Sequence, residues 1–210
     1  MKKFLTLMGT TLLLASLASA APCTLGADVT SLGTCDFGGL TFSDWGVQVA
    51  GGATAIILFG AGSNVGADGT VYVRFQVGTN PSPVPSFTDI LLNYSVTGGV
   101  IGVDMFLGTH SGSVTITENV CAVAFVQGAC PNGQSLLPGG LVVSNQNTIN
   151  QASLTGSAAT IYIQKDIQMQ AGSTLSDFTN SHEVPEPMTF LLMGSGLLGL
   201  GLLRRRMSGN

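Results

Sequence analysis

The chain has 210 residues, of which 29 are glycine and only 9% are charged. Five of its seven basic residues lie near the two ends, so residues 21–187 contain two basic residues against all eleven acidic ones, a net charge of −9. Proteins bind nucleic acid by neutralising phosphates with Lys and Arg, so this composition excludes nucleic acid as a partner. About 150 residues remain between the two ends, which is enough for one domain with a full core.

The N-terminal segment has the pattern of a secretion signal. Two lysines follow the first methionine, and residues 4–17 form an apolar run that Thr, Gly and Ser interrupt. Ala18 and Ala20 supply the small side chains that signal peptidase requires, so cleavage after Ala20 leaves Ala21 as the mature N-terminus. The sequence therefore predicts an exported protein with a signal helix at residues 1–20 and signal peptidase as its first partner.

All four cysteines lie in the segment predicted to be exported: Cys23, Cys35, Cys121 and Cys130. An even number of cysteines in an oxidising compartment predicts disulfides, and four cysteines allow three pairings. Proximity along the chain favours Cys23–Cys35 and Cys121–Cys130. A zinc site is the alternative, but the C-x-x-C spacing and the neighbouring histidines of zinc motifs are missing.

Residues 21–170 show the period-two alternation of β-strands. Four runs place apolar side chains on one face and polar side chains on the other: residues 71–77, 90–96, 114–117 and 161–169. Lys165 is the one break in the apolar face of the last run. Glycine pairs, Asn-Gly and Asp-Gly separate the runs and suit hairpin turns. We therefore expect an all-β domain at residues 21–170, an antiparallel β-sandwich of about nine to eleven strands.

Beyond residue 170 the chain becomes polar and then apolar. Residues 171–183 are rich in Ser, Thr, Asn and Asp, which predicts a flexible stalk. Residues 188–203 carry no charge, and as a helix they would extend roughly 24 Å, close to the ~30 Å of a hydrocarbon core. The basic residues that follow should stay on the cytoplasmic side. We expect a single C-terminal transmembrane helix.

Residues 184–210 resemble the PEP-CTERM sorting signal of exported bacterial proteins. The motif residues before the apolar span are Val184, Pro185, Glu186 and Pro187, and the basic cluster after it is Arg204, Arg205 and Arg206. The two prolines remove backbone donors and favour an extended segment that a processing enzyme can grip. The resemblance implies an exosortase-type membrane enzyme as a partner, one that is expected to cut near Pro-Glu-Pro.

The resemblance also carries an expectation about location. It implies that the chain is held in the inner membrane by its C-terminal helix and then reaches the cell surface or extracellular matrix. Residues 38–43 and 112–121 resemble glycine-rich domains often found with this tail, which have no settled biochemical role. Their hosts tend to make extracellular polysaccharide, so the resemblance implies a place in the envelope, exopolysaccharide or biofilm matrix.

A glycine-rich turn follows a predicted strand at residues 60–66. Dinucleotide binding would need a helix behind these glycines to hold the pyrophosphate. An Asp-Gly turn and an alternating strand follow instead. We interpret the segment as a hairpin and expect no cofactor.

His110, Ser111 and Asp104 lie close together in the sequence and are the only candidates for a hydrolytic triad. No glycine-flanked nucleophile elbow accompanies them. The second histidine, His182, lies in the predicted stalk. We therefore expect that the protein is not an enzyme.

Glu118 lies on a strand pattern just before Cys121 and is interpreted as an edge-strand charge that deters association between sheets, with cation binding as the alternative. The other acidic residues do not have the spacing of a calcium-binding loop. No metal site is predicted.

Trp45, Tyr72, Tyr94 and Tyr162 would be able to stack on sugar rings if they shared an exposed face. Single aromatic residues in a sandwich belong more often to the core, but Tyr72 and Tyr162 occupy the polar sides of their strands. The leading hypothesis is a structural or adhesive protein of the envelope or exopolysaccharide. A carbohydrate-binding module is the alternative, with extracellular polysaccharide as its partner.

Overall fold

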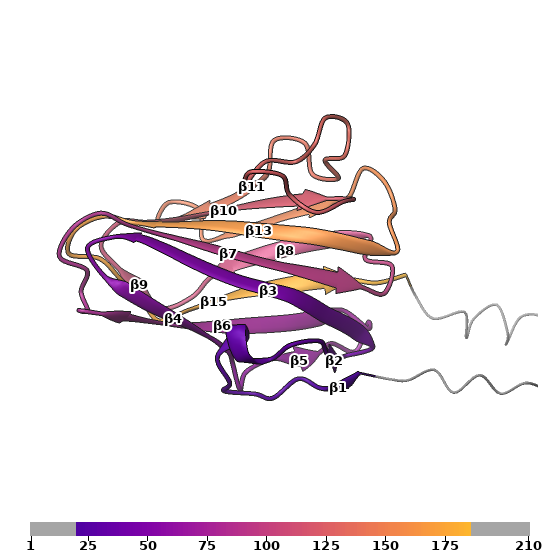
Figure 1. The fold of residues 1–210 in the computed structure, drawn as a ribbon, viewed down its shortest axis with the longest axis horizontal. Helices are drawn as coiled ribbons and strands as arrows, with labels where there is room; N and C mark the ends of the chain where they lie inside the picture. Colours follow the sequence, from indigo (N-terminus) through magenta and orange to yellow (C-terminus); the bar gives the residue numbers. More distant parts are fainter. Residues whose placement is uncertain (1–19, 186–210) are drawn as a thin grey trace, which may run out of the picture.

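The computed structural model describes residues 20–185, which form two β-sheets packed face to face (Figure 1). The predicted fold class, an all-β, antiparallel, sandwich-like fold, is confirmed. The one helical element in this part of the chain is a 3-10 turn, η1 (Val29–Ser31). No helix within residues 20–185 is long and apolar enough to cross a membrane. The predicted signal helix and transmembrane helix lie outside the described residues.

The first sheet has seven strands in the order β1-β2-β3-β7-β13-β10-β11. Neighbouring strands are antiparallel, except that β1 and β2 are parallel. Their bounds are β1 (Ala21–Pro22), β2 (Cys35–Phe37), β3 (Leu40–Gly51), β7 (Thr88–Thr97), β13 (Thr160–Met169), β10 (Val114–Cys121) and β11 (Leu141–Ser144).

The second sheet has six strands, in the order β12-β8-β15-β6-β4, with the short β5 also paired to β6. Their bounds are β12 (Ile149–Ser153), β8 (Gly102–Leu107), β15 (Asp177–Glu183), β6 (Val71–Asn80), β4 (Thr54–Phe59) and β5 (Asn64–Val65). A separate pair is formed by β9 (His110–Ser111) and β14 (Thr174–Leu175). Residues 20–185 thus contain fifteen strands, more than the nine to eleven expected, because four of them are only two residues long.

The core lies between the inward faces of the two sheets. The predicted alternation is confirmed on β6, where the inward side chains are all buried: Val71, Val73, Phe75 and Val77. An aromatic cluster fills one part of the core, with ring centroids 5.1 Å apart for Trp45 and Tyr94 and 6.0 Å apart for Phe42 and Phe59. Each buried side chain of this size stabilises the fold by about 1.5–3 kcal/mol.

The prediction of a flexible stalk at residues 171–183 is wrong. Residues 177–183 form β15, which pairs with β6 on one side and with β8 on the other. Phe178, Asn180 and His182 point into the core and are fully buried. The strand was missed because only one of its inward side chains is apolar. The β-domain therefore extends beyond residue 170 to the end of β15.

Both disulfides favoured by proximity are present, and no cysteine of residues 20–185 is free. Cys23–Cys35 ties the N-terminal segment to β2, at the edge of the seven-stranded sheet. Cys121–Cys130 closes a short loop that begins at the end of β10. In the chain-entropy model, a loop of this size stabilises a fold by about 3 kcal/mol.

Candidate functional site

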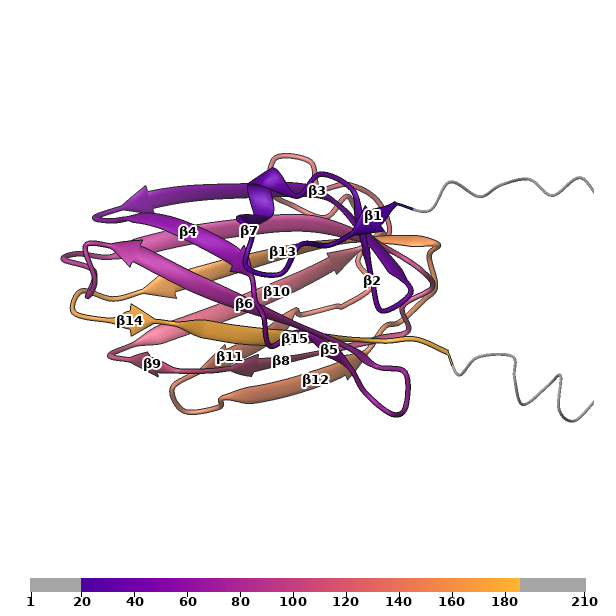
Figure 2. The same ribbon diagram turned by 90° about the horizontal axis from the view of Figure 1, so that it is seen from below.

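The sorting motif begins where the folded body ends. Val184 and Pro185 directly follow β15, whereas Glu186, Pro187 and the arginines Arg204, Arg205 and Arg206 lie outside the described residues. Ala20 and Ala21 open the described part at β1, and Ala18 lies outside it. Figures 1 and 2 show that β1 and the end of β15 lie at the same end of the sandwich.

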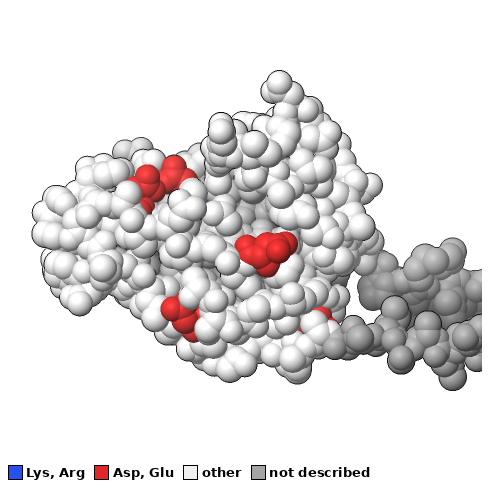
Figure 3. Space-filling view, in the orientation of Figure 1, with Lys and Arg blue, Asp and Glu red and all other residues white. Residues whose placement is uncertain are grey.

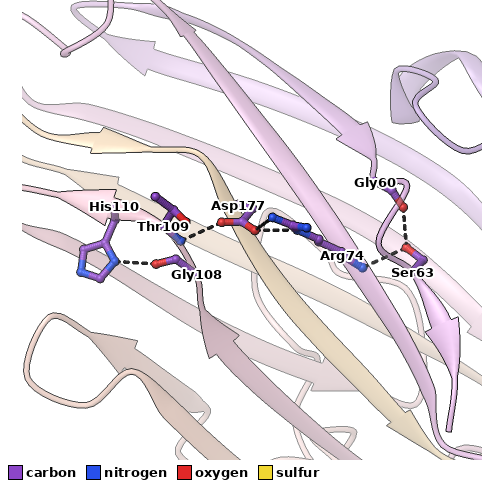
Figure 4. Close-up of polar contacts among 7 residues, drawn as sticks. All are labelled: Gly60, Ser63, Arg74, Gly108, Thr109, His110 and Asp177. Carbon is purple, nitrogen blue, oxygen red and sulfur yellow. Dashed lines mark hydrogen bonds and ion pairs between the residues drawn. The ribbon is translucent and has the colours of Figure 1, made fainter.

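The candidate triad residues do not come together. His110 Nδ1 lies 2.7 Å from the carbonyl oxygen of Gly108 (Figure 4), and Ser111 Oγ lies 2.8 Å from Thr174 Oγ1. The acidic group beside this loop is that of Asp177, which accepts a hydrogen bond of 2.7 Å from the Thr109 amide. Neither the histidine nor the serine is hydrogen-bonded to the other, so this geometry does not activate a nucleophile.

Asp177 instead connects the loop to the outer face of the six-stranded sheet. It forms an ion pair with Arg74 of β6 (Figure 4). The Arg74 amide donates to Ser63 Oγ over 3.0 Å, and Ser63 Oγ donates to the Gly60 carbonyl over 2.9 Å. The glycine-rich turn at residues 60–66 is therefore held against β6 and leads into β5, as the hairpin interpretation predicts.

Tyr72 and Tyr162 lie on different sheets. Tyr72 belongs to β6 and Tyr162 to β13, and both point away from the core because their neighbours along each strand are buried. Tyr94 and Trp45 pack against each other on the core side, with ring centroids 5.1 Å apart. The four aromatic residues therefore do not share one exposed face, and a platform built from Tyr72 and Tyr162 together is not present.

Tyr162 lines a groove on the outer face of the seven-stranded sheet. The groove has a volume of about 790 Å³. Its floor is formed by outward side chains of β7 and β13, namely Leu91, Asn93, Tyr162 and Gln164. Figure 3 shows the face of the molecule seen in Figure 1, which is largely uncharged with scattered acidic groups and is hollowed near its centre. We call this feature the β13 groove.

One wall of the β13 groove comes from β3. The register of β3 against β7 shifts between Ser43 and Gly46, which marks a β-bulge, and Asp44 in this bulge has a φ of 57°. Asp tolerates this left-handed conformation better than most residues. The Asp44 carboxylate accepts a hydrogen bond of 2.7 Å from Ser95 Oγ. The bulge thus directs a fixed carboxylate to the groove, a use of bulges that is common at binding sites.

The opposite wall is the loop closed by the Cys121–Cys130 disulfide. Phe125 and Gln127 of this loop line the groove. The loop turns tightly at Gln127 and Gly128, which have φ values of 51° and 75°, the pattern of a type I′ turn. The disulfide therefore helps to fix the position of an aromatic and an amide side chain over the sheet.

The polar groups on the floor are held in place. Gln164 is buried, and its amide Nε2 donates to Asn93 Oδ1 over 3.1 Å. Gln164 and Asn93 present further amide donors and acceptors beside the Tyr162 ring. Sequence reasoning identified Tyr162 but missed Asp44, Asn93 and Gln164, because only the strand register brings them together.

The chemistry of the β13 groove favours a neutral ligand with many hydroxyl groups. Its lining contains one carboxylate, that of Asp44, several amides and three aromatic rings, but no Lys or Arg. Amide and carboxylate groups bind hydroxyls, and aromatic rings pack against apolar faces of a ligand. An anionic ligand would find no positive partner among these residues.

The interpretation of Glu118 as an edge-strand charge is wrong. Its strand, β10, is covered by β11 on one side and by β13 on the other. The Glu118 side chain points into the core, is fully buried, and forms an ion pair of 2.6 Å with Lys165, its cross-strand partner. The break in alternation at Lys165 therefore marks a polar group inside the sandwich.

The fold and the C-terminal residues define an exported, disulfide-bonded, all-β protein with a sorting tail. A family model, the PEP-CTERM protein-sorting motif, matches residues 183–206. The chain therefore carries the PEP-CTERM sorting motif, which confirms the resemblance to an exosortase substrate and indicates an exported protein sorted to the cell surface.

No curated protein matches the chain. Among solved structures, the chain is similar to TmCBM61 in complex with β-1,4-galactotriose, with 14% identity, a TM-score of 0.34, and coverage of 67% of this chain and 85% of that one. It is also similar to a structure from a study of carbohydrate-binding modules of the β-sandwich superfamily, with 12% identity, a TM-score of 0.34, and coverage of 80% and 62%. TM-scores at this level carry no argument about the ligand of this chain.

Proposed function

We propose that the protein is a non-enzymatic surface protein with a structural or adhesive role in the envelope or exopolysaccharide, released from a membrane-held form by an exosortase-type enzyme. The observation that carries the proposal is the position of the sorting motif. The match starts at residue 183, the last residue of β15. A cut near Pro-Glu-Pro would therefore free the whole folded body and remove residues 188–203.

The composition of the body supports a passive role outside the cell. Its carboxylates far outnumber its two basic residues, so it is soluble and repelled by anionic surfaces. His110 and Ser111 are bonded to other partners, which supports the absence of hydrolytic chemistry at this loop.

The second candidate function is carbohydrate binding, and the β13 groove favours it. Tyr162 and Phe125 offer rings that pack against the C–H faces of a sugar, while Asp44 and Asn93 offer fixed acceptors for hydroxyls. Because no cation lines the groove, we propose a neutral saccharide as the ligand. Binding in this groove would give the adhesive role a defined surface.

The two functions are separated by the retention of purified protein on the host's extracellular polysaccharide and on an array of neutral and uronate-containing oligosaccharides. We expect Tyr162→Ala to weaken retention on neutral glycans about tenfold, because an aromatic contact of this kind contributes about 1.4 kcal/mol. Tyr72→Ala is the matched control, since Tyr72 is a partly buried tyrosine on the other sheet, and it should bind as wild type does.

Each outcome of this experiment favours or contradicts one of the proposed functions. If the wild type and both variants are retained equally strongly, the structural or adhesive role stands, but the β13 groove is not the surface that binds the polysaccharide. Absence of wild-type retention on every polysaccharide tested would contradict an adhesive role and a carbohydrate-binding role alike.

A further inference from the structure

Three side chains that can react with one another meet in the interior between the two sheets. Lys165 of β13 places Nζ 2.6 Å from Glu118 Oε2. From the opposite sheet, Asn180 of β15 places Nδ2 3.2 Å from the same Glu118 oxygen. All three side chains are fully buried. An amine and a carboxamide thus contact the same oxygen atom of a buried carboxyl group.

The carboxamide of Asn180 is held in one orientation. Its Nδ2 also donates to the Asp104 carbonyl, over 2.5 Å, and its Oδ1 accepts a hydrogen bond of 2.6 Å from the Tyr94 hydroxyl. The amide nitrogen therefore faces Glu118, and the amide oxygen faces a hydroxyl donor. Lys165 Nζ and Asn180 Nδ2 contact the same Glu118 oxygen, and the Tyr94 hydroxyl is placed to stabilise negative charge on the amide oxygen.

The surroundings favour the uncharged forms of Lys165 and Glu118. Burial lowers the pKa of Lys165 and raises the pKa of Glu118, and the attraction between the two groups opposes both shifts only in part. Apolar groups lie beside the amine, with Met105 Sδ at 3.7 Å and the Phe178 ring centroid at 5.7 Å. Glu118 Oε1 is buried without a hydrogen-bond partner, which is costly for a carboxylate and less so for a carboxylic acid. An uncharged lysine amine is a nucleophile.

We propose that Lys165 and Asn180 join in an intramolecular isopeptide bond, with Glu118 transferring the protons. Lys165 Nζ attacks Asn180 Cγ, a new C–N bond forms, and the bond between Cγ and Nδ2 breaks. The amine and the carboxamide become one secondary amide and one molecule of ammonia. No oxidant, metal or cofactor takes part.

Glu118 is placed to carry the protons of this reaction. As a carboxylic acid it donates a proton to Nδ2, which leaves as ammonia, and it recovers a proton from Nζ as the new amide forms. It therefore ends as a carboxylic acid, the form that its buried site favours. The Tyr94 hydroxyl stabilises the oxygen of the tetrahedral intermediate through the bond that it already makes to Oδ1. The reaction occurs once in each molecule and acts on no external substrate.

An amide between Lys165 and Glu118 is the competing product of the same cluster, and it would release water. The Asn180 carboxamide is favoured as the electrophile because Glu118 can then act as the proton carrier, whereas in the competing reaction no third group is placed to do so. The two products differ in the molecule that is lost, so mass distinguishes them.

The bond would have a mechanical consequence at the sorting tail. Asn180 lies three residues before the start of the matched motif, and β15 is the last strand of the body. A force on the C-terminal tail enters the body through β15, whose backbone strand pairing joins it only to β6 and β8 of the six-stranded sheet. A covalent bond to β13 transfers that force to the seven-stranded sheet, so β15 cannot be pulled out of the fold.

The test is the mass of the mature protein purified from its host and reduced to remove the disulfides. We expect the measured mass to be lower, by one ammonia, than the mass calculated from the amino-acid sequence of the mature protein. Tryptic digestion adds a second readout, because Arg74 and Lys165 are the only basic residues between residues 21 and 187. Trypsin does not cleave after an acylated lysine, so the denatured protein should be cut after Arg74 but not after Lys165.

The wild-type measurements decide the question even where a variant fails to fold. An unmodified mass with cleavage after both Arg74 and Lys165 would overturn the proposal, and the loss of one water would overturn the assignment of Asn180. Glu118→Gln should leave the mass unmodified, while Tyr94→Phe should slow the loss of ammonia. None of these measurements depends on export or processing, so a result that overturns the isopeptide bond does not contradict the proposed function.

Discussion

Glu118, Lys165 and Asn180 occupy core positions that an alternating strand normally fills with Val or Ile. A buried ion pair is a poor way to stabilise a core, because the loss of solvation often exceeds the attraction between the charges. Apolar residues of similar size are frequently as stable or more stable at such sites. A reaction that replaces the amine and the carboxamide by one neutral amide removes the titratable amine of Lys165 from the interior. Chemistry between these residues explains their presence better than stability does.

His182 lies in the same interior and gives the fold a pH dependence. Burial lowers the pKa of His182 to about 3. The unfolded chain binds the proton at its ordinary pKa, near 6.5, so the unfolded state takes up more protons between these values. The stability that His182 contributes is therefore fully present above about pH 6.5 and is lost as the pH falls.

We expect the free energy of unfolding of the wild type to fall by about 3 kcal/mol more than that of His182→Leu between about pH 7 and about pH 4. Denaturant titrations of both proteins at several pH values measure this difference. The pKa of Glu118 is raised, so its contribution has the opposite sign, but it is common to both proteins and cancels. Parallel pH profiles for the two proteins would show that His182 is not buried as described.

At the scale of elements, β15 is the strand on which both the core and the tail depend. It lies between β8 and β6, and it carries Asn180 and His182 into the core and Asp177 to the ion pair with Arg74. The chain continues directly from this strand into the sorting motif. The tail is therefore attached to an interior strand of the six-stranded sheet.

Backbone amide exchange tests the position of β15 in the full-length protein. We expect the amides of residues 178–182 to exchange on the order of 10³-fold more slowly than those of the exposed loop at residues 123–128, which corresponds to about 4 kcal/mol of protection. Exchange measured by mass spectrometry on peptides from both segments gives the comparison. Equal, fast exchange in both would restore the flexible stalk and remove β15 from the fold.

The contrast between β6 and β15 shows what the sequence could predict. On β6 the inward residues are apolar and the outward ones polar, so period two is visible and the strand follows from it. On β15 polar residues stand on both faces, and their burial depends on partners far along the chain, such as Tyr94 and Arg74. Local periodicity carries no information about such partners.

Local periodicity also fails to predict the buried cluster around Lys165 and most of the β13 groove. The break at Lys165 is visible in the sequence, but its register opposite Glu118 and the approach of Asn180 from the other sheet depend on strand pairing and sheet packing. Tyr162 could be chosen from its polar position on a strand, whereas Asp44 reaches the β13 groove only through a bulge. The sorting motif, a linear signal, could be identified from the sequence in full.

At the scale of the whole molecule, the proposed membrane anchoring and the proposed carbohydrate binding involve different parts of the chain. The described ends of the chain lie at one end of the sandwich (Figures 1 and 2), whereas the β13 groove opens on the outer face of a sheet. All residues that line the groove precede residue 165. Processing near Pro-Glu-Pro therefore leaves the groove and both disulfides within the released body.

Export and processing at the sorting signal are tested most directly by mass spectrometry of the two ends of the mature protein. The protein is isolated from normal cells and from a strain without the exosortase-type enzyme. In normal cells we expect the chain to begin at Ala21 and to end near Pro185-Glu186-Pro187, without residues 188–203. In the mutant strain we expect the same N-terminus and a chain that retains residues 188–210. A chain in normal cells that still extends to Asn210 would contradict processing at the sorting signal, and one that retains residues 1–20 would contradict export.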